Sequence, residues 1–403
     1  MTPINIAIAL AALLLAGVVF NPRVMKAPFW RATVTPLASI IGSGFLVAGP
    51  ILAHTAGTQA WLAMLALCGI AYLFGGALRY NILYVEPTIA SQPSRLTAGI
   101  ERASDLALSL AYFISVAYYL NLFAAFGLRM EGVIDPFWIR VAATTTIAAI
   151  GIIGALGGLT GLERLEVGTV GLKLCLIGGL FAALAVASIG AVETGRFEWP
   201  EIEHTEGLHE VGILLGLVIL VQGFETSRYL GSKYDAALRV RSMKWAQWIA
   251  TAIYLVFILL ITRYFTDGLP TEGGETAIID MLTPVSAVIA PLIIIAALAS
   301  QLSAAVADLN GAGGLLAEIF GQRVTVNLGN VVTAAVAIAV TWAANIYEII
   351  AYASQAFVAY YALQAAQAAL AAHRRQQPGL AALYGGGVVI ALVIIAFATP
   401  VSV

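Results

Sequence analysis

Residues 34–52 read VTPLASIIGSGFLVAGPIL and residues 212–231 read GILLGLVILVQGFETSRYLG, two hydrophobic segments interrupted by short polar stretches that contain glycine. The first carries Gly42-Ser43-Gly44, and the second carries Gln222-Gly223-Phe224-Glu225. An unpaired backbone amide or carbonyl is costly in hydrocarbon, so a broken helix survives there only where it lines a protein-enclosed cavity. Matched breaks in two halves of a chain are typical of a transporter's binding site. The sequence therefore predicts two broken helices around one site.

The composition indicates an integral membrane protein. The chain is 61% hydrophobic and 10% charged, with a mean hydropathy of +0.93, whereas about a quarter of the residues of a soluble domain are charged. We predict one transmembrane domain over residues 1–403, without a separately folding appendage. The net charge of −2 argues against a nucleic-acid partner. Cys68 and Cys175 lie in apolar segments, so they imply neither a disulfide nor a metal site.

At about 20 residues for each span, the hydrophobic segments predict about twelve transmembrane helices. The first span has no basic residues before it, so we interpret it as a retained helix and not as a signal peptide. Glu348 follows the short turn at Ala344-Asn345, where a carboxylate at a helix N-terminus is the ordinary explanation. The predicted helices lie near residues 3–21, 34–54, 59–84, 103–127, 136–157, 166–190, 209–230, 243–264, 279–305, 325–343, 345–372 and 379–400.

Basic residues are distributed unequally between alternate loops. One set of loops and ends holds most of the Lys and Arg residues, from Arg23 to Arg375, whereas the other set holds only Arg129, Arg140, Arg196 and Arg263. The positive-inside rule assigns the first set to the cytoplasm. We therefore expect a multi-pass protein of the cell membrane, of the bacterial inner-membrane type, with both termini outside.

Few ionisable residues lie deep within the predicted spans, and such residues mark a pathway or an ion pair by default. Lys173 lies between Gly171 and Cys175, and burial disfavours the charged form of a lysine. It is either a proton carrier or a structural cation that donates to exposed carbonyls. Glu225 either binds a substrate ammonium or caps free amides where the second broken helix restarts.

A further polar group lies in the segment around Asp308. Ser300 and Ser303 share a helix face with i, i+3 spacing, although serine hydroxyls in membranes commonly bond back to their own helix. Tyr112 and Tyr119 are candidate substrate contacts, with packing as the alternative. The chain contains neither a metal-ligand cluster, nor a phosphate-binding loop, nor a nucleophile elbow, so the sequence does not predict an enzyme.

Four segments resemble the amino acid–polyamine–organocation (APC) superfamily. The resemblance covers most of residues 33–372 and implies a LeuT-type fold, in which five helices are repeated in inverted orientation. The repeats would be residues 33–191 and 209–373, with an extra N-terminal helix at 3–21 and an extra C-terminal helix at 379–400. The similar segments are IIGSGFLVAGP (40–50, first core helix), GLERLEVGTVGLKLCLI (161–177, fifth), VQGFETSRYLG (221–231, sixth) and ALASQLSAAVADLNGAGGLLAE (297–318, eighth).

The resemblance also implies roles for particular residues. Backbone amides near the first break would hold a carboxylate, carbonyls near the second would accept an ammonium, and Phe224 would act as a gate. Lys173 would replace a sodium site and approach the first broken helix. Taken together with the residues singled out above, the predicted substrate-binding residues are Ile41, Gly42, Ser43, Gly44, Tyr112, Tyr119, Gln222, Gly223, Phe224 and Glu225, and the predicted coupling residues are Lys173, Ser300, Ser303 and Asp308.

The leading hypothesis is a proton-coupled secondary transporter that moves a small amino acid or related amine by alternating access, without a cofactor. Its partners would be the substrate, protons and the lipid bilayer. One alternative is an inorganic-ion carrier of the same fold, with Asp308, Glu225 and Asn310 as ligands. The other is a non-transporting sensor or accessory subunit, against which the lack of a soluble signalling domain argues.

Overall fold

The computed structural model describes residues 2–91, 94–156, 166–200, 207–266, 268–321 and 323–402, which fold into helices and connecting turns without a strand. Nine helical stretches of these residues are long and apolar enough to cross a membrane, and one of them, Pro28–Tyr84, contains two long helices. The all-helical membrane fold predicted from the hydropathy is confirmed.

The helices follow the predicted order. The first half of the chain forms α1 (Pro3–Val19), α2 (Pro22–Lys26), α3 (Pro28–Ala56), η1 (Gly57–Gln59), α4 (Ala60–Tyr84), α5 (Glu86–Ser91), α6 (Arg95–Leu128), η2 (Arg129–Glu131), α7 (Pro136–Ala155) and α9 (Glu166–Glu193). The second half forms α10 (Leu208–Leu215), η3 (Val218–Val221), η4 (Phe224–Ser232), α11 (Ala236–Ile261), η5 (Thr262–Tyr264), η6 (Gly274–Thr276), α12 (Ile278–Leu282), α13 (Ile289–Ile319), α14 (Val326–Ala343), α15 (Ile346–Arg374) and α16 (Pro378–Phe397).

Local chemistry fixes several of these boundaries. Asn345 caps α15 by accepting hydrogen bonds from the amides of Tyr347 and Glu348, and the Glu348 carboxylate accepts from the Asn345 amide at 2.7 Å. This capping box satisfies donors that a helix N-terminus leaves free. The box marks the boundary between α14 and α15 at the short turn Ala344-Asn345. It also confirms that Glu348 is a carboxylate at a helix N-terminus.

One predicted span is displaced along the chain. The hydropathy placed a helix at 279–305, but α12 ends at Leu282, a turn containing Pro284 follows, and α13 extends to Ile319. Asp308 lies inside α13, where the Ser115 hydroxyl of α6 donates a hydrogen bond to its carboxylate. A partner on another helix offsets part of the cost of burying this carboxylate.

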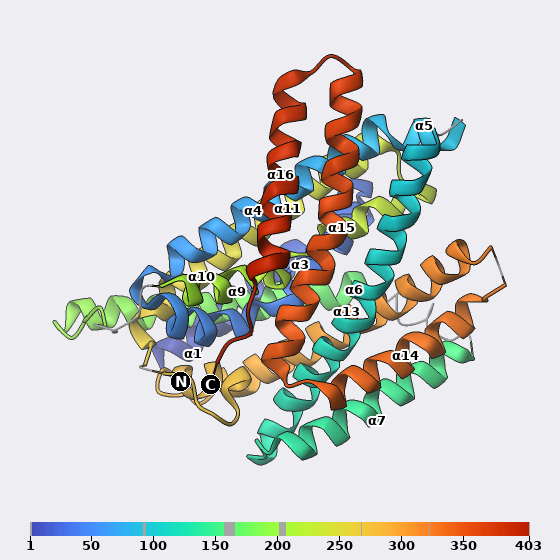
Figure 1. Cartoon of the computed structure of the whole chain (residues 1–403). Coiled ribbons are helices and arrows are strands. Elements are labelled where there is room, and N and C mark those ends of the chain that lie inside the picture. Colours follow the sequence, from blue (N-terminus) through green and yellow to red (C-terminus); the bar gives the residue numbers. More distant parts are fainter. Residues whose placement is uncertain are drawn as a thin grey trace.

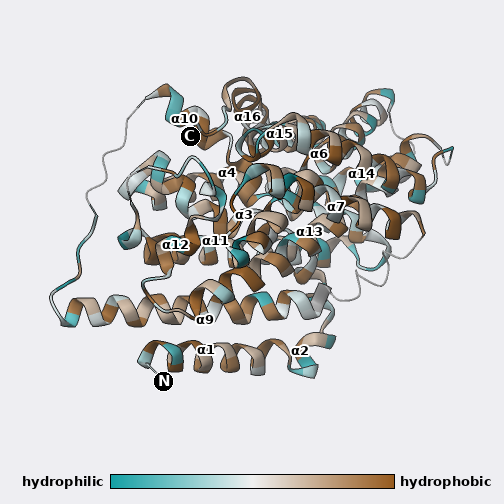
Figure 2. Cartoon of the chain, turned by 90° about the horizontal axis from the view of Figure 1, so that it is seen from below, coloured by the Kyte–Doolittle hydropathy of each residue, from teal (hydrophilic) through white to brown (hydrophobic). Residues whose placement is uncertain are grey.

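Helices of the first half of the chain pack on helices of the second half. Helix α4 packs on α11, α6 on α13 and α7 on α14, while α3 packs on both η3 and η4; α7 and α14 run side by side at one edge (Figure 1). Each of these pairs joins counterparts of the two halves. Outside this core, α1 lies along α9 at the edge of the bundle (Figure 2), and α16 packs on α15. The repeat limits 33–191 and 209–373 stay predictions.

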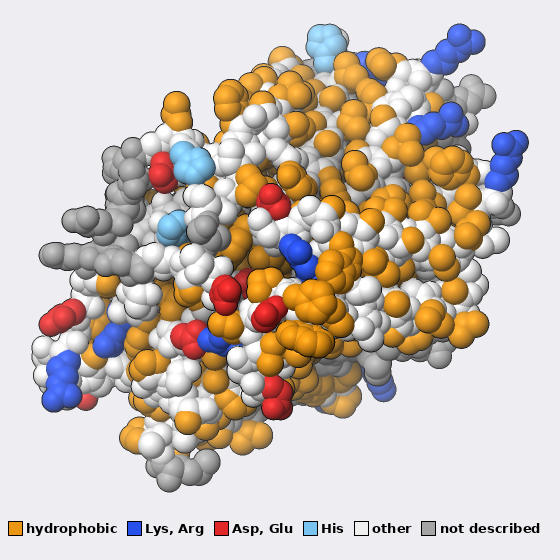
Figure 3. Space-filling view, turned by 60° about the horizontal axis from the view of Figure 1, so that its bottom comes forward, with side chains coloured by type: hydrophobic (Ala, Val, Ile, Leu, Met, Phe, Trp, Pro, Cys, Tyr) orange, Lys and Arg blue, Asp and Glu red, His pale blue; other side chains and the backbone are white. Residues whose placement is uncertain are grey.

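Charged side chains gather toward the ends of the molecule. Figure 3 shows acidic side chains on the end that is turned forward, and basic side chains without acidic neighbours at the opposite, upper right edge. Hydrophobic side chains cover much of the surface between them (Figure 3). This distribution fits the charge asymmetry of the loops in the sequence.

The predicted break at Gly42-Ser43-Gly44 is wrong. Helix α3 is continuous from Pro28 to Ala56, with Pro36 and Pro50 inside it. A Cβ atom on Gly42 would lie 3.3 Å from the Cβ of Ala304, and one on Gly44 would overlap the side chain of Leu220. The two glycines therefore serve close packing of α3 against α13 and η3, and the helix tolerates them because this packing offsets their low helix propensity.

Candidate functional site

The second predicted break is present. Helix α10 gives way to η3, Gln222 is extended (φ −83°, ψ 173°), and Gly223 has a φ of +118° before η4 begins. A Cβ atom on Gly223 would lie 2.5 Å from the Ser39 hydroxyl and 2.7 Å from the Ile40 amide nitrogen. Glycine is therefore required both by the left-handed conformation and by the close approach of the α3 backbone.

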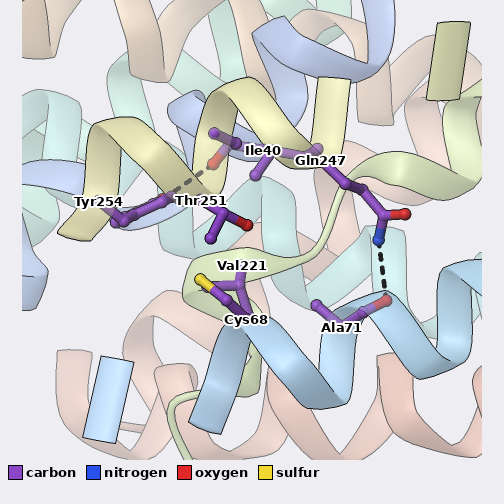
Figure 4. A pocket seen from close by; sticks show the side chains of 8 residues that line it. Ile40, Cys68, Ala71, Val221, Gln247, Thr251 and Tyr254 are labelled. Carbon is purple, nitrogen blue, oxygen red and sulfur yellow. Dashed lines mark hydrogen bonds between the residues drawn. The ribbon is translucent and has the colours of Figure 1, made fainter. Parts of the chain in front are cut away.

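Side chains from other helices satisfy the backbone groups that the break releases. The Ser354 hydroxyl of α15 accepts from the Ile219 amide at 2.9 Å and donates to the Gly216 carbonyl at 2.6 Å. The Tyr254 hydroxyl of α11 reaches the carbonyls of Leu220 and Ile40. Figure 4 shows Tyr254 beside a small cavity that also borders Val221. Because these hydrogen bonds pair the released backbone groups, the broken segment is stable in the protein interior.

Glu225 and Gln222 place two acceptor atoms at the break. One Glu225 carboxylate oxygen, Oε2, accepts from the Gly223 amide at 3.0 Å and from the Tyr361 hydroxyl at 2.7 Å. Gln222 donates through Nε2 to the Tyr119 hydroxyl at 2.9 Å. The other oxygens, Oε1 of Glu225 and Oε1 of Gln222, are buried without a hydrogen-bond partner. Glu225 thus caps the break and still presents one unused carboxylate oxygen.

An aromatic wall lies against these groups. The ring of Phe224 stacks on Tyr361 with centroids 5.0 Å apart, and Phe74 of α4 stacks on Tyr361 at 5.2 Å. Tyr112 meets Phe357 of α15 edge-on at 5.9 Å. The predicted residues Tyr112, Tyr119 and Phe224 are all buried, so the structure brings them to the same region as the break.

Lys173 lies on the other side of α3. Its side chain is 2% exposed and lines a cavity of about 20 Å³ between α3, α9 and α13, which has room for about one water molecule. Ile41 and Ser300 line the same cavity. The side chain of Ser43 lies outside the described part of the chain. Lys173 therefore shares a cavity with Ile41 of α3 and with Ser300, while its role in coupling stays a prediction.

The remaining coupling residues are placed apart from Lys173. Asp308 is 2% exposed and accepts a hydrogen bond from Ser115, whose hydroxyl also contacts the Tyr112 carbonyl at 3.1 Å. Neither Asp308 nor Ser303 lines the cavity of Lys173. Asp308 belongs instead to the interface of α13 with α6, the helix that carries Tyr112 and Tyr119.

An ion-pair network ties the end of the broken segment to three other helices. Arg228 of η4 contacts Glu101 of α6 and lies 3.5 Å from Glu86 of α5. Arg239 of α11 pairs with Glu86 at 2.7 Å and donates to the Arg228 carbonyl at 2.9 Å. This network, which we call the η4 clamp (Glu86, Glu101, Arg228, Arg239), was missed in the sequence. In the sequence its residues resemble ordinary loop charges. The position of Arg228, only a few residues after the break, was the feature that could have indicated an ion pair there.

The site also depends on Ser115, Tyr254, Ser354 and Tyr361, which the sequence did not single out. Their partners lie on other helices, so no local pattern marks them. Among the described residues there is no group of three or more His, Cys, Asp or Glu side chains that could hold a metal ion.

Comparisons with known proteins agree with this architecture. A family model described as an APC superfamily transporter matches residues 22–398. An uncharacterized protein of Aquifex aeolicus (strain VF5) is 41% identical over 348 residues, which is 85% of this chain and 84% of that protein. A sodium-coupled sialic acid symporter, solved in a substrate-bound outward-open state, superposes with a TM-score of 0.54 at 15% identity over 98% of both chains. A mutant manganese transporter of Eremococcus coleocola superposes with a TM-score of 0.54 at 15% identity, over 92% of this chain and 87% of that one. The structural neighbours share the LeuT-type fold.

Proposed function

The chain belongs to the APC superfamily of transporters, and we propose that it is a proton-coupled secondary transporter of a small amine or amino acid. Such a chain is a multi-pass membrane protein and not an enzyme. We place it in the cell membrane with both termini outside, because that orientation puts the basic loops in the cytoplasm.

The unused oxygens of Glu225 and Gln222 carry the substrate assignment. Both residues are at most 1% exposed, and leaving a buried acceptor without a donor costs about 1–3 kcal/mol. An ammonium group has three donors and no acceptor, so it would satisfy both oxygens at once. Phe224 and Tyr112 supply apolar and aromatic surface for the rest of a small molecule.

The continuous helix α3 changes the expected binding of a carboxylate. In a helix the amides of Gly42 and Gly44 are hydrogen-bonded within the chain, so they offer no free donor in this conformation. We propose that the amine end is recognised at Gln222–Glu225, and that a carboxylate would bind only in a transport state in which α3 opens near Gly42–Gly44.

Lys173 is the proposed coupling residue. Its cavity adjoins both α3 and Ser300, so protonation of its amine would change the contact between α9 and α3. A proton that binds one transport state better than another shifts the equilibrium between them. The η4 clamp would close the cytoplasmic end of the broken segment and release it when that end opens.

Uptake into proteoliposomes tests this proposal. Labelled amines and amino acids are offered with an inward proton gradient or an inward sodium gradient. We expect uptake driven by the proton gradient without sodium. Glu225→Gln should abolish uptake, and Lys173→Met should remove its pH dependence, whereas Lys244→Met, at an exposed lysine of α11, should behave like the parent. Sodium-dependent uptake, or a full pH response in Lys173→Met, would contradict the mechanism.

An inorganic cation is the second candidate substrate. It is favoured by the two buried carboxylates Glu225 and Asp308, and a neighbour of the same fold is a manganese transporter. In this case Mn²⁺ uptake in the same vesicles should exceed amine uptake, and Asp308→Asn should abolish it as completely as Glu225→Gln.

A further inference from the structure

A second cavity, away from the broken segment, lies where α4, α5, α6 and α15 meet. Its volume is about 140 Å³. The helix ends that form it carry the basic residues we assign to the cytoplasmic side, near the top of Figure 1 where α5 lies. Its polar lining residues are Tyr84, Thr88, Thr97, Gln367, Arg374 and Arg375.

Gln367 shows that this cavity suits a polar ligand. Its side chain is 3% exposed, and neither its amide nitrogen nor its amide oxygen has a hydrogen-bond partner. A buried amide without hydrogen-bond partners is disfavoured, because it has lost its bonds to water without replacing them. A turn of this side chain toward the cavity would let its amide nitrogen donate to an acceptor oxygen of a ligand there.

The two arginines give the cavity a positive charge that the protein does not neutralise. Arg374 and Arg375 form no ion pair with a described residue, in contrast to Arg228 and Arg239 of the η4 clamp. The Arg375 guanidinium instead lies 4.2 Å from the centre of the Tyr84 ring, and both residues line the cavity. Two guanidinium groups with hydroxyl and amide donors nearby form a typical phosphate site.

The rest of the lining is apolar and continues onto the outer surface. Val85, Ile100 and Ala371 line the cavity, together with Leu370, which is 39% exposed. Leu96, next to Thr97 in the chain, is also exposed. A free phosphate ester would leave these groups in water, whereas a lipid would cover them with its acyl chains.

We propose that this cavity binds the phosphate of an anionic phospholipid from the cytoplasmic leaflet. Arg374 and Arg375 contact the phosphate, Gln367 donates to an oxygen of the headgroup, and the acyl chains lie along Leu370. Basic pockets between helices on this side of a membrane bind anionic headgroups. Because α15 also carries Tyr361, the lipid would hold the helix that positions Glu225. The proposed substrate plays no part in this inference.

Thermal unfolding of the purified chain in neutral detergent tests the site. Phosphatidylglycerol should raise the Tm of the parent by several degrees, because a ligand that binds only the folded state stabilises it. Phosphatidylcholine should not. The double variant Arg374→Gln/Arg375→Gln should lose most of this shift. Gln367→Met, which keeps both charges, should also reduce it.

The matched control is Lys233→Gln/Arg323→Gln, which removes two exposed charges at other turns on the same side. We expect it to keep the full phosphatidylglycerol shift, and the melting curves in phosphatidylcholine show that each variant is folded. An equal shift in Arg374→Gln/Arg375→Gln and the parent would overturn the site, as would an equal loss in the control. Glycerol phosphate that reproduces the shift would assign the cavity to a soluble phosphate ester and overturn the lipid assignment.

Discussion

Tyr361→Phe is the sharpest test of how the broken segment is held. The substitution removes one oxygen atom, which donates to Glu225 at 2.7 Å, and it keeps the ring that stacks on Phe224 and Phe74. Both bonded residues are at most 1% exposed. A hydrogen bond to a charged group contributes about 1.5–3 kcal/mol, so the variant should lose roughly that free energy of unfolding.

The expected change is measurable by thermal unfolding in detergent. With an unfolding entropy of about 2.1 cal/mol/K for each residue, this loss lowers the Tm of a chain of 403 residues by roughly 2–4 °C. Tyr352→Phe removes the same atom from an exposed position on α15, so its Tm should match that of the parent. If Tyr361→Phe also melts like the parent, the hydroxyl does not hold Glu225 and the described geometry of the break is refuted.

Three further substitutions probe the break, the η4 clamp and the buried carboxyl group of η6. Gly223→Ala should lower the free energy of unfolding by about 1–3 kcal/mol from its φ alone, with a further loss from overlap with α3. It should therefore lower the Tm, whereas Gly190→Ala, where a Cβ meets nothing within 4 Å, should not. Equal Tm values for the two variants would refute the close approach of Gly223 to α3. Glu86→Gln removes the charge that bridges Arg228 and Arg239. It should lower the free energy of unfolding by about 1–2 kcal/mol, which lies between the contributions of surface and of buried ion pairs. It should also speed maleimide labelling of a cysteine placed at the buried Ser227, and unchanged labelling would show that the network does not close this end. Glu275 is buried in η6, which raises the pKa of its carboxyl above the ordinary 4.5, although Arg129 opposes the shift. Ionisation of this carboxyl therefore destabilises the folded state as pH rises above 4.5. Glu275→Gln should raise the Tm at neutral pH, and the difference in Tm from the parent should shrink as pH falls toward 4.5. A difference in Tm that grows toward acid pH would contradict the raised pKa.

Much of the fold could be predicted because its signals are local. The length and hydropathy of each segment set the helices within a few residues for most spans, and the box of Asn345 and Glu348 marks the start of α15. The break at Gln222-Gly223 could also be predicted, since a glycine close to the polar residues Gln222 and Glu225 in an apolar run indicates a backbone that leaves the helix. The depth of Lys173 followed from its apolar flanks.

The site could be predicted only in part because its contacts are made between distant segments. Tyr361, Ser354 and Tyr254 complete the break from helices far along the chain. In the sequence they are ordinary residues of apolar helices. Asp308 was grouped with Lys173 as a coupling residue, but its bond to Ser115 places it at the interface of α13 with α6.

The sequence by itself determined an all-helical membrane chain with a broken second segment and a buried lysine, because hydrophobicity and backbone preference act over a few neighbouring residues. Only the tertiary structure decided the role of Gly42 and Gly44. A glycine in an apolar helix either breaks the helix or admits a neighbour, and the difference depends on what packs there. Here Ala304 and Leu220 fill that space, so α3 stays helical.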